Sequence, residues 1–191
     1  MMTKQNIMLM MNTVILILVS VGFLLVYQFV VPTDIDDKLF NQVVTLQDTQ
    51  IVQNVPAEGM YQVVYTKQNA VNTRGEIVGV VYNVRASYNY FMPTDLGYLE
   101  LLVGIDKDSN VSVQIVKFKQ TESYTAGLQW YVYEYFQNMP IDGLVLVPVE
   151  DLEPEAGATA RATTGKVKEL VGLAIQHYLA QSASLSEVNL G

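Results

Sequence analysis

The chain has 191 residues, enough for one domain of ordinary size with a short accessory segment. Its 19 acidic residues outnumber its 11 basic residues and give a formal net charge of -8, the opposite of the basic surface that nucleic-acid binding requires. Because the chain has no cysteine and one histidine, His177, the composition excludes disulfides, thiolate catalysis, iron–sulfur clusters and multi-histidine metal sites.

The N-terminal segment is uncharged and strongly apolar. Residues 5–33 contain no charged side chain, and residues 7–31 form a run longer than the roughly 20 apolar residues that cross a bilayer core. This run is too long for a signal peptide and has no small-residue cleavage site after it. Lys4 precedes the run and three aspartates follow at 34–37, which favours a cytoplasmic N-terminus. We therefore expect residues 1–31 to be a cytoplasmic stub and a single-pass transmembrane anchor in the cell membrane, with the following domain on the extracytoplasmic face.

The next segment has a helical pattern. Ile35, Leu39 and Val43 recur every four residues, the spacing of one face of a short amphipathic helix. We assign residues 32–60 to a helical linker.

Alternating and β-branched apolar residues predict two β-hairpins. Turn-forming polar residues separate the two strands of each hairpin, at 72–75 and at 106–110. The four strands are expected at residues 61–65, 76–88, 97–105 and 111–118.

The C-terminal part is expected to end in a helix. Residues 128–136 are rich in aromatics at spacings that fit either a helix or a strand, so both interpretations stay open. Apolar residues from Val167 to Tyr178 fall at helical spacing and predict an amphipathic helix. Strand pairs followed by a packed helix indicate a domain at residues 61–182, with a tail at 183–191. The expected fold class is α+β, with one N-terminal transmembrane helix followed by a single domain of antiparallel strands packed with helices.

One polar motif has part of the spacing of a calcium-binding loop. Asp106, Asp108 and Asn110 match the start of such a loop, but Val111 stands where a glycine is needed and Lys117 where a glutamate is needed. A polar hairpin turn is the better interpretation. We expect no metal site and no catalytic residue of the chain's own.

A loop of small residues immediately precedes the predicted C-terminal helix. Gly157 and Ala158 would let backbone N–H groups approach a phosphate closely, and the helix dipole would favour its negative charge. Thr159 adds a hydroxyl group. On spacing alone, an ordinary helix cap is the commoner role of such a loop, so a phosphate site and a cap both remain open.

Two stretches of sequence and the expected topology resemble one protein family. Residues 97–128 read GYLELLVGIDKDSNVSVQIVKFKQTESYTAGL, and residues 156–159 read AGAT, similar to a flavinylation motif that is usually Ser/Thr-Gly-Ala-Thr. The chain thus resembles, over residues 75–179, the FMN-binding domain family, as found in RnfG of the Rnf electron transport complex and in NqrC of the sodium-pumping NADH:quinone reductase. Ala156 replaces the motif's hydroxyl residue, and the glycine loop at 122–127 has extra residues and no proline.

The resemblance implies a cofactor and the residues that hold it. FMN would be attached through a phosphoester to Thr159, with Thr163 as a second candidate acceptor. The other residues to which the resemblance assigns cofactor binding are Ala156, Gly157, Ala158, Glu122, Gly127, Leu128 and Tyr98.

The resemblance also implies a function. We expect a membrane-anchored flavoprotein that relays electrons within an ion-translocating, Rnf- or Nqr-like redox complex. Its partners would be the other subunits and a flavin transferase, and it would be an electron carrier more than a stand-alone enzyme. The absence of cysteine and the presence of a single histidine agree with redox chemistry that belongs to a flavin. The alternatives are a flavin-free interaction subunit that keeps the fold, and an extracytoplasmic flavin reductase that acts on an external acceptor.

Overall fold

The computed structural model describes most of the region after residue 38 and a short helix before it. The described residues are 6, 11–22, 34–35, 39–89, 96–119, 128–129, 131–146 and 161–188. The chain divides into two compact units, Met1–Thr33 and Asp34–Gly191.

The first unit corrects the predicted fold class. Residues 11–22 are helical. Among the described residues, no helix is both long enough and apolar enough to cross a membrane. The predicted fold with an N-terminal transmembrane helix is therefore wrong, and the described residues form mostly an antiparallel sheet with helices α3 and α5.

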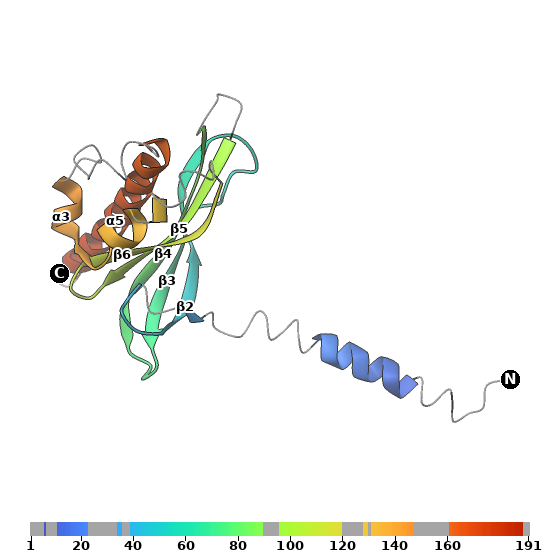
Figure 1. The fold of residues 1–191 in the computed structure, drawn as a ribbon. Coiled ribbons are helices and arrows are strands. Elements are labelled where there is room, and N and C mark those ends of the chain that lie inside the picture. The colour runs from blue at the N-terminus through green and yellow to red at the C-terminus, as the bar shows by residue number, and fades with distance from the viewer. Residues whose placement is uncertain are drawn as a thin grey trace. The chain divides into compact units, whose positions relative to one another are not determined.

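The second unit is built on a seven-stranded sheet in which every strand pairs with its neighbours in the sequence, in the order β1-β2-β3-β4-β5-β6-β7 (Figure 1). All the pairs are antiparallel. The strands are β1 (Asp34–Ile35), β2 (Val44–Ile51), β3 (Tyr61–Asn72), β4 (Ile77–Asn89), β5 (Leu96–Asp106), β6 (Asn110–Lys119) and β7 (Met139–Pro140).

Both predicted hairpins are confirmed, as the pairs β3–β4 and β5–β6. The side chain of Asn72 closes the first turn by accepting hydrogen bonds from the backbone N–H groups of Arg74 and Glu76. Asp106 closes the second turn in the same way, because its Oδ1 accepts from the backbone N–H groups of Asp108 and Asn110. The motif with partial calcium-loop spacing is therefore a hairpin turn held by its own aspartate.

The segment expected to be a helical linker contains strand β2 instead. Val44 and Leu46 are buried two positions apart, which is the period of a strand with one face against a core. The fourfold spacing of Ile35, Leu39 and Val43 misled the prediction, because Val43 is exposed and does not share a buried face with Leu39.

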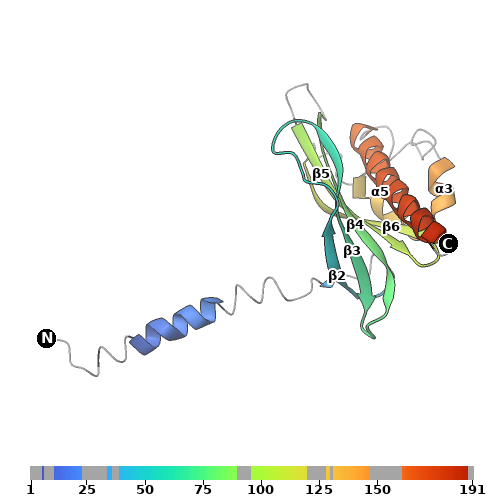
Figure 2. The same ribbon diagram turned by 180° about the vertical axis from the view of Figure 1, so that it is seen from behind.

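Helix α5 (Arg161–Val188) confirms the predicted C-terminal helix and lies across one face of the sheet (Figures 1 and 2). It contacts β3, β4 and β5. The segment left open between helix and strand contains a π-helical turn, Tyr131–Tyr135, and it is followed by the short helix α3 (Ile141–Leu146). The buried residues between the helices and the sheet include Tyr82, Val84, Ala86, Leu99, Leu101, Val103, Leu128, Tyr131, Leu170 and Ala174.

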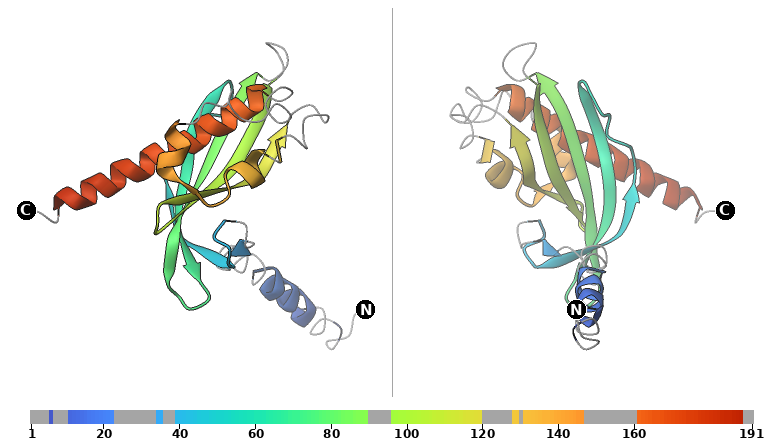
Figure 3. Two further views of the ribbon diagram at one scale, coloured as in Figure 1. Left: turned by 60° about the vertical axis from the view of Figure 1, so that its left-hand side comes forward. Right: turned by 90° about the vertical axis from the view of Figure 1, so that its right-hand side faces the viewer.

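The opposite face of the sheet, which we call the open face, carries a smaller apolar cluster at one end. This cluster contains Leu39, Val44, Leu46, Ala70 and Val81, with the ring of Phe40 packed against it. A Cβ atom built on Gly79 would collide with the backbone carbonyl oxygen of Ile105 and would lie 2.6 Å from the ring of Phe40, so a glycine is needed there. The segment before β2 therefore covers one end of the open face. In the right view of Figure 3 the strands lie in front of α5.

Candidate functional site

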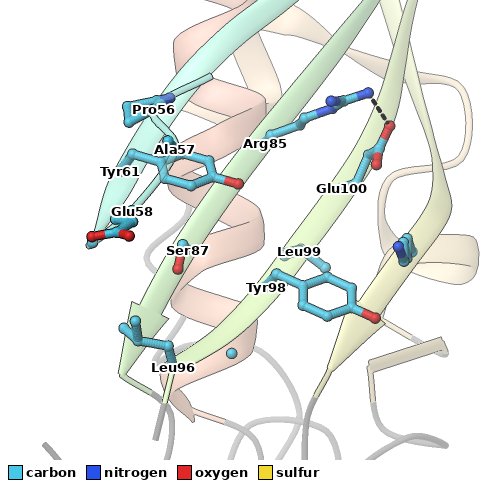
Figure 4. Close-up of a pocket in the computed structure, with 13 residues that line it drawn as sticks. Pro56, Ala57, Glu58, Tyr61, Arg85, Ser87, Leu96, Tyr98, Leu99 and Glu100 are labelled. Carbon is cyan, nitrogen blue, oxygen red and sulfur yellow. Dashed lines mark hydrogen bonds and ion pairs between the residues drawn. The ribbon is translucent and has the colours of Figure 1, made fainter. Parts of the chain in front are cut away.

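The open face carries two rows of side chains at the end away from Phe40. Strand registry places Tyr61 of β3 opposite Ser87 of β4, and Ser87 opposite Tyr98 of β5. Opposed residues point to the same face of a sheet, so the three side chains form one row. Figure 4 shows Ser87 between the two tyrosine rings. A small residue between two large ones leaves a slot in the surface.

The second row is a polar network. Glu100 Oε1 accepts hydrogen bonds from Arg85 Nη2 at 2.9 Å and from Asn83 Nδ2 at 2.8 Å, and Arg85 Nε donates to Asn83 Oδ1 at 3.0 Å. The guanidinium carbon of Arg85 lies 4.0 Å from the centroid of the Tyr65 ring, within cation–π distance. The side chains of Arg85 and Glu100 are only 30% and 17% exposed, so the network is held in place without being closed to solvent.

Lys117 of β6 continues this row, since registry places it opposite Glu100. Its ammonium nitrogen lies 5.2 Å from the centroid of the Tyr98 ring. Lys117 makes no ion pair with the described residues, so its N–H groups remain available to a ligand.

A pocket of about 730 Å³, which we call the open-face pocket, lies over this end of the sheet (Figure 4). Its lining includes residues of both rows, namely Tyr61, Ser87, Tyr98, Arg85, Glu100 and Lys117. The segment 56–59, between β2 and β3, adds a wall that includes Glu58. The volume lies within the range of about 300–1,000 Å³ that is usual for small-molecule sites. The pocket is therefore a candidate binding site.

Of the residues that the resemblance assigns to FMN, the structure describes Tyr98 and Leu128. Tyr98 lies in the open-face pocket and is half-buried. Leu128 is fully buried in the core on the α5 side of the sheet. The structure does not bring these two side chains together, because the sheet separates them. The other assigned residues, Ala156, Gly157, Ala158, Thr159, Glu122 and Gly127, lie outside the described residues.

The second candidate acceptor, Thr163, is described and buried in the first turn of α5. Its Oγ1 accepts a hydrogen bond of 3.0 Å from the hydroxyl of Tyr88, near the end of β4. Thr163 is 4% exposed and Tyr88 is 6% exposed. This contact fixes the N-terminal turn of α5 to one end of the sheet.

The ends of three strands lie at this same end. Asn89, the last residue of β4, pairs with Leu96, the first residue of β5, and Lys119, the last residue of β6, pairs with Tyr98. The segment that contains Glu122 and Gly127 follows Lys119 directly, and the segment that contains Thr159 leads directly into α5. The segments that the resemblance assigns to FMN are therefore joined in sequence to the end of β6 and to the start of α5.

Several tyrosines are buried on the α5 side and stay protonated at neutral pH. Burial raises the pKa of Tyr82 to about 12, with a smaller contribution from nearby Tyr178. Burial also raises the pKa of Tyr131 and of Tyr135. The Tyr82 ring meets the His177 ring edge to face, with centroids 5.5 Å apart. The Tyr82 hydroxyl and His177 Nδ1 make no hydrogen bond within the described part of the chain.

Sequence reasoning missed the open-face pocket except for Tyr98. The signal was present in β4, where Asn83, Arg85 and Ser87 alternate with the buried residues Val84 and Ala86. Such alternation places polar residues on one face of a strand. Which other strands contribute depends on the registry, which no local pattern contains.

Across the described ranges, no group of three or more histidine, aspartate or glutamate side chains is placed to hold a metal ion.

Comparison with known proteins gives no match. No protein-family model matches the chain, and neither the curated proteins nor the solved structures contain a significant match.

Proposed function

We propose that the protein carries FMN, esterified to Thr159, and relays electrons between partner redox centres as a subunit of an ion-translocating, Rnf- or Nqr-like complex. The proposal starts from the resemblance of residues 97–128 and 156–159 to the FMN-binding family. It does not include a transmembrane helix. FMN would supply the redox chemistry when bound, and the chain would bind and orient it.

The observation that carries the proposal is the meeting of β4, β5, β6 and α5 at one end of the domain. The hydrogen bond from Tyr88 to Thr163 holds the start of α5 there. Thr159 stands two positions before Arg161, the first residue of α5. The first turn of a helix offers unpaired N–H groups and a positive dipole end, both of which favour a phosphate. A phosphoester at Thr159 would thus begin close to groups that stabilise its charge.

The burial of Thr163 supports Thr159 over Thr163 as the acceptor. A transferase must reach the hydroxyl that it modifies, and Thr163 is 4% exposed. The oxygen of Thr163 is also engaged by the hydroxyl of Tyr88. Esterification of Thr163 would require this buried contact to open.

The test is the intact mass of the full chain after co-expression with a flavin transferase. Esterification joins the phosphate of FMN to a threonine oxygen, so the expected mass increases by one FMN less one water. Thr159→Ala should abolish the increase and the yellow colour after denaturation. Thr163→Val is the matched control and should keep both, because its side chain has a similar volume and the hydroxyl is not the acceptor.

Two outcomes would contradict the proposal. If Thr159→Ala keeps the added mass, the acceptor is another hydroxyl. If the wild-type chain from its native host is colourless and unmodified, the chain is a flavin-free subunit.

A further inference from the structure

We propose that the open-face pocket binds a neutral saccharide of one to three sugar rings. The proposal does not depend on FMN, because the pocket lies on the face of the sheet opposite α5 and Leu128. It rests on the shape of the slot, on the hydrogen-bonding groups beside it and on the charge of its lining.

The slot between Tyr61 and Tyr98 has the dimensions of a site for a flat ring. Their strands are two positions apart in the sheet, so their backbones lie about 10 Å apart, with Ser87 between them. The face of a tyrosine ring carries partial negative charge, and the C–H bonds on the face of a pyranose carry partial positive charge. A sugar ring can therefore stack on either tyrosine while the small Ser87 side chain leaves room beneath it.

The polar row beside the slot both donates and accepts hydrogen bonds, as a sugar hydroxyl also does. Arg85 uses Nε and Nη2 within the network, so Nη1 keeps its two N–H groups for a ligand. Glu100 accepts through Oε1 within the network and keeps Oε2 as an acceptor. Because Asn83 bonds to both residues, these groups are oriented before a ligand arrives, which reduces the entropy lost on binding.

The charges that line the pocket balance. Two cations, Arg85 and Lys117, are matched by two anions, Glu58 and Glu100. The whole chain has a net charge of -8, so its long-range field repels anionic ligands. A planar aromatic ligand would use the tyrosine rings but would leave most of the polar groups without partners. A neutral ligand with many hydroxyl groups can contact the tyrosine rings and also form hydrogen bonds with the polar groups.

The experiment is a titration of the full chain with cellotriose, maltotriose and triacetylchitotriose, followed by saturation-transfer NMR and calorimetry. At least one of these should bind with a dissociation constant of about 0.1–1 mM. Ser87→Phe fills the slot and should abolish binding. Tyr98→Ala should weaken binding about tenfold through the loss of one stacking face. Arg74→Ala, in the exposed β3–β4 turn, is the control and should bind as the wild type does.

Thermal unfolding of each variant separates loss of the site from loss of the fold. Tyr98 is half-buried on the open face, so Tyr98→Ala keeps the core and remains informative even if Ser87→Phe does not fold. The proposal is overturned if none of the three saccharides binds at about 10 mM. It is also overturned if binding survives Tyr98→Ala unchanged, or if free FMN or an acidic peptide binds the pocket more tightly than every saccharide.

Discussion

The two faces of the sheet are made by the same strands and have different physical characters. The face under α5 is apolar and closed by residues of the chain itself. The open face carries an apolar cluster where Phe40 covers it, and it becomes more polar and accessible towards Tyr61 and Tyr98. In this fold, stability therefore comes from one part of the sheet and accessible polar surface from another. The covered face holds the domain together, and the uncovered end of the open face is available to a ligand.

The largest expected effect is the loss of stability when a residue of the covered face is truncated. Leu101 of β5 is fully buried beneath α5, and Leu101→Ala should lower the free energy of unfolding by about 2–5 kcal/mol. Leu96 is on the same strand and 40% exposed, so Leu96→Ala should cost less than about 1 kcal/mol. Urea denaturation of both variants measures the difference. Similar losses would mean that the two positions are not distinguished by burial.

The next largest effect on stability is expected at the covered end of the open face. The added methyl group of Gly79→Ala would collide with the backbone carbonyl oxygen of Ile105 and would lie 2.6 Å from the Phe40 ring, so it should destabilise the fold by about 1–3 kcal/mol. Gly172→Ala in α5 is the matched control, since nothing lies within 4 Å of its added Cβ. It should stabilise the fold by about 0.5–1 kcal/mol through helix propensity. A neutral Gly79→Ala would contradict the close approach of both the Ile105 backbone and the Phe40 ring to this glycine.

Two tyrosines of β4 on the covered face should respond differently when their hydroxyl groups are removed. Tyr88→Phe removes a hydrogen bond to buried Thr163 and should cost about 1 kcal/mol. Tyr82→Phe removes a buried hydroxyl that has no partner among the described residues, and should leave stability unchanged or raise it by less than about 1 kcal/mol. Thermal unfolding at neutral pH compares them. The assignment fails if Tyr82→Phe is the more damaging change.

The smallest effect on stability is expected in the polar row of the open face. Because Arg85 and Glu100 are partly exposed, Glu100→Gln should cost less than about 1 kcal/mol of stability. The same variant should weaken saccharide binding, because the orientation of Arg85 depends on the carboxylate. A large loss of stability with unchanged binding would assign the network to the fold instead of the site.

The sequence predicted the parts of the fold that local patterns determine. Alternation around Tyr61 and the polar turn at Asp106 identified both hairpins, and the helical spacing after Val167 identified α5. The prediction failed near Ile35, where three residues at a fourfold spacing were too few to distinguish a helix from the edge of a sheet. It also failed for the transmembrane helix, because no helix among the described residues is long and apolar enough to cross a membrane.

The candidate site was much harder to predict than the fold. The pocket combines side chains from β3, β4, β5 and β6, and registry alone brings them together. The register of β5 with β6 shifts between Glu100 and Leu101, and this shift places Lys117 opposite Glu100 where Val116 would otherwise stand. The resemblance could supply Tyr98 but not its neighbours. Thr159 and Glu122 stay predictions, because they lie outside the described residues.

The order of the elements has a consequence for synthesis of the chain. Each strand pairs with the one made just before it, so the sheet can assemble while translation continues. The helix that lies across its apolar face, from Arg161 to Val188, is the last of the described elements. A ribosome-bound chain that ends before Arg161 therefore exposes Leu101, Val103 and their neighbours to water. This interval is when the nascent protein most needs a chaperone, and truncated products should aggregate.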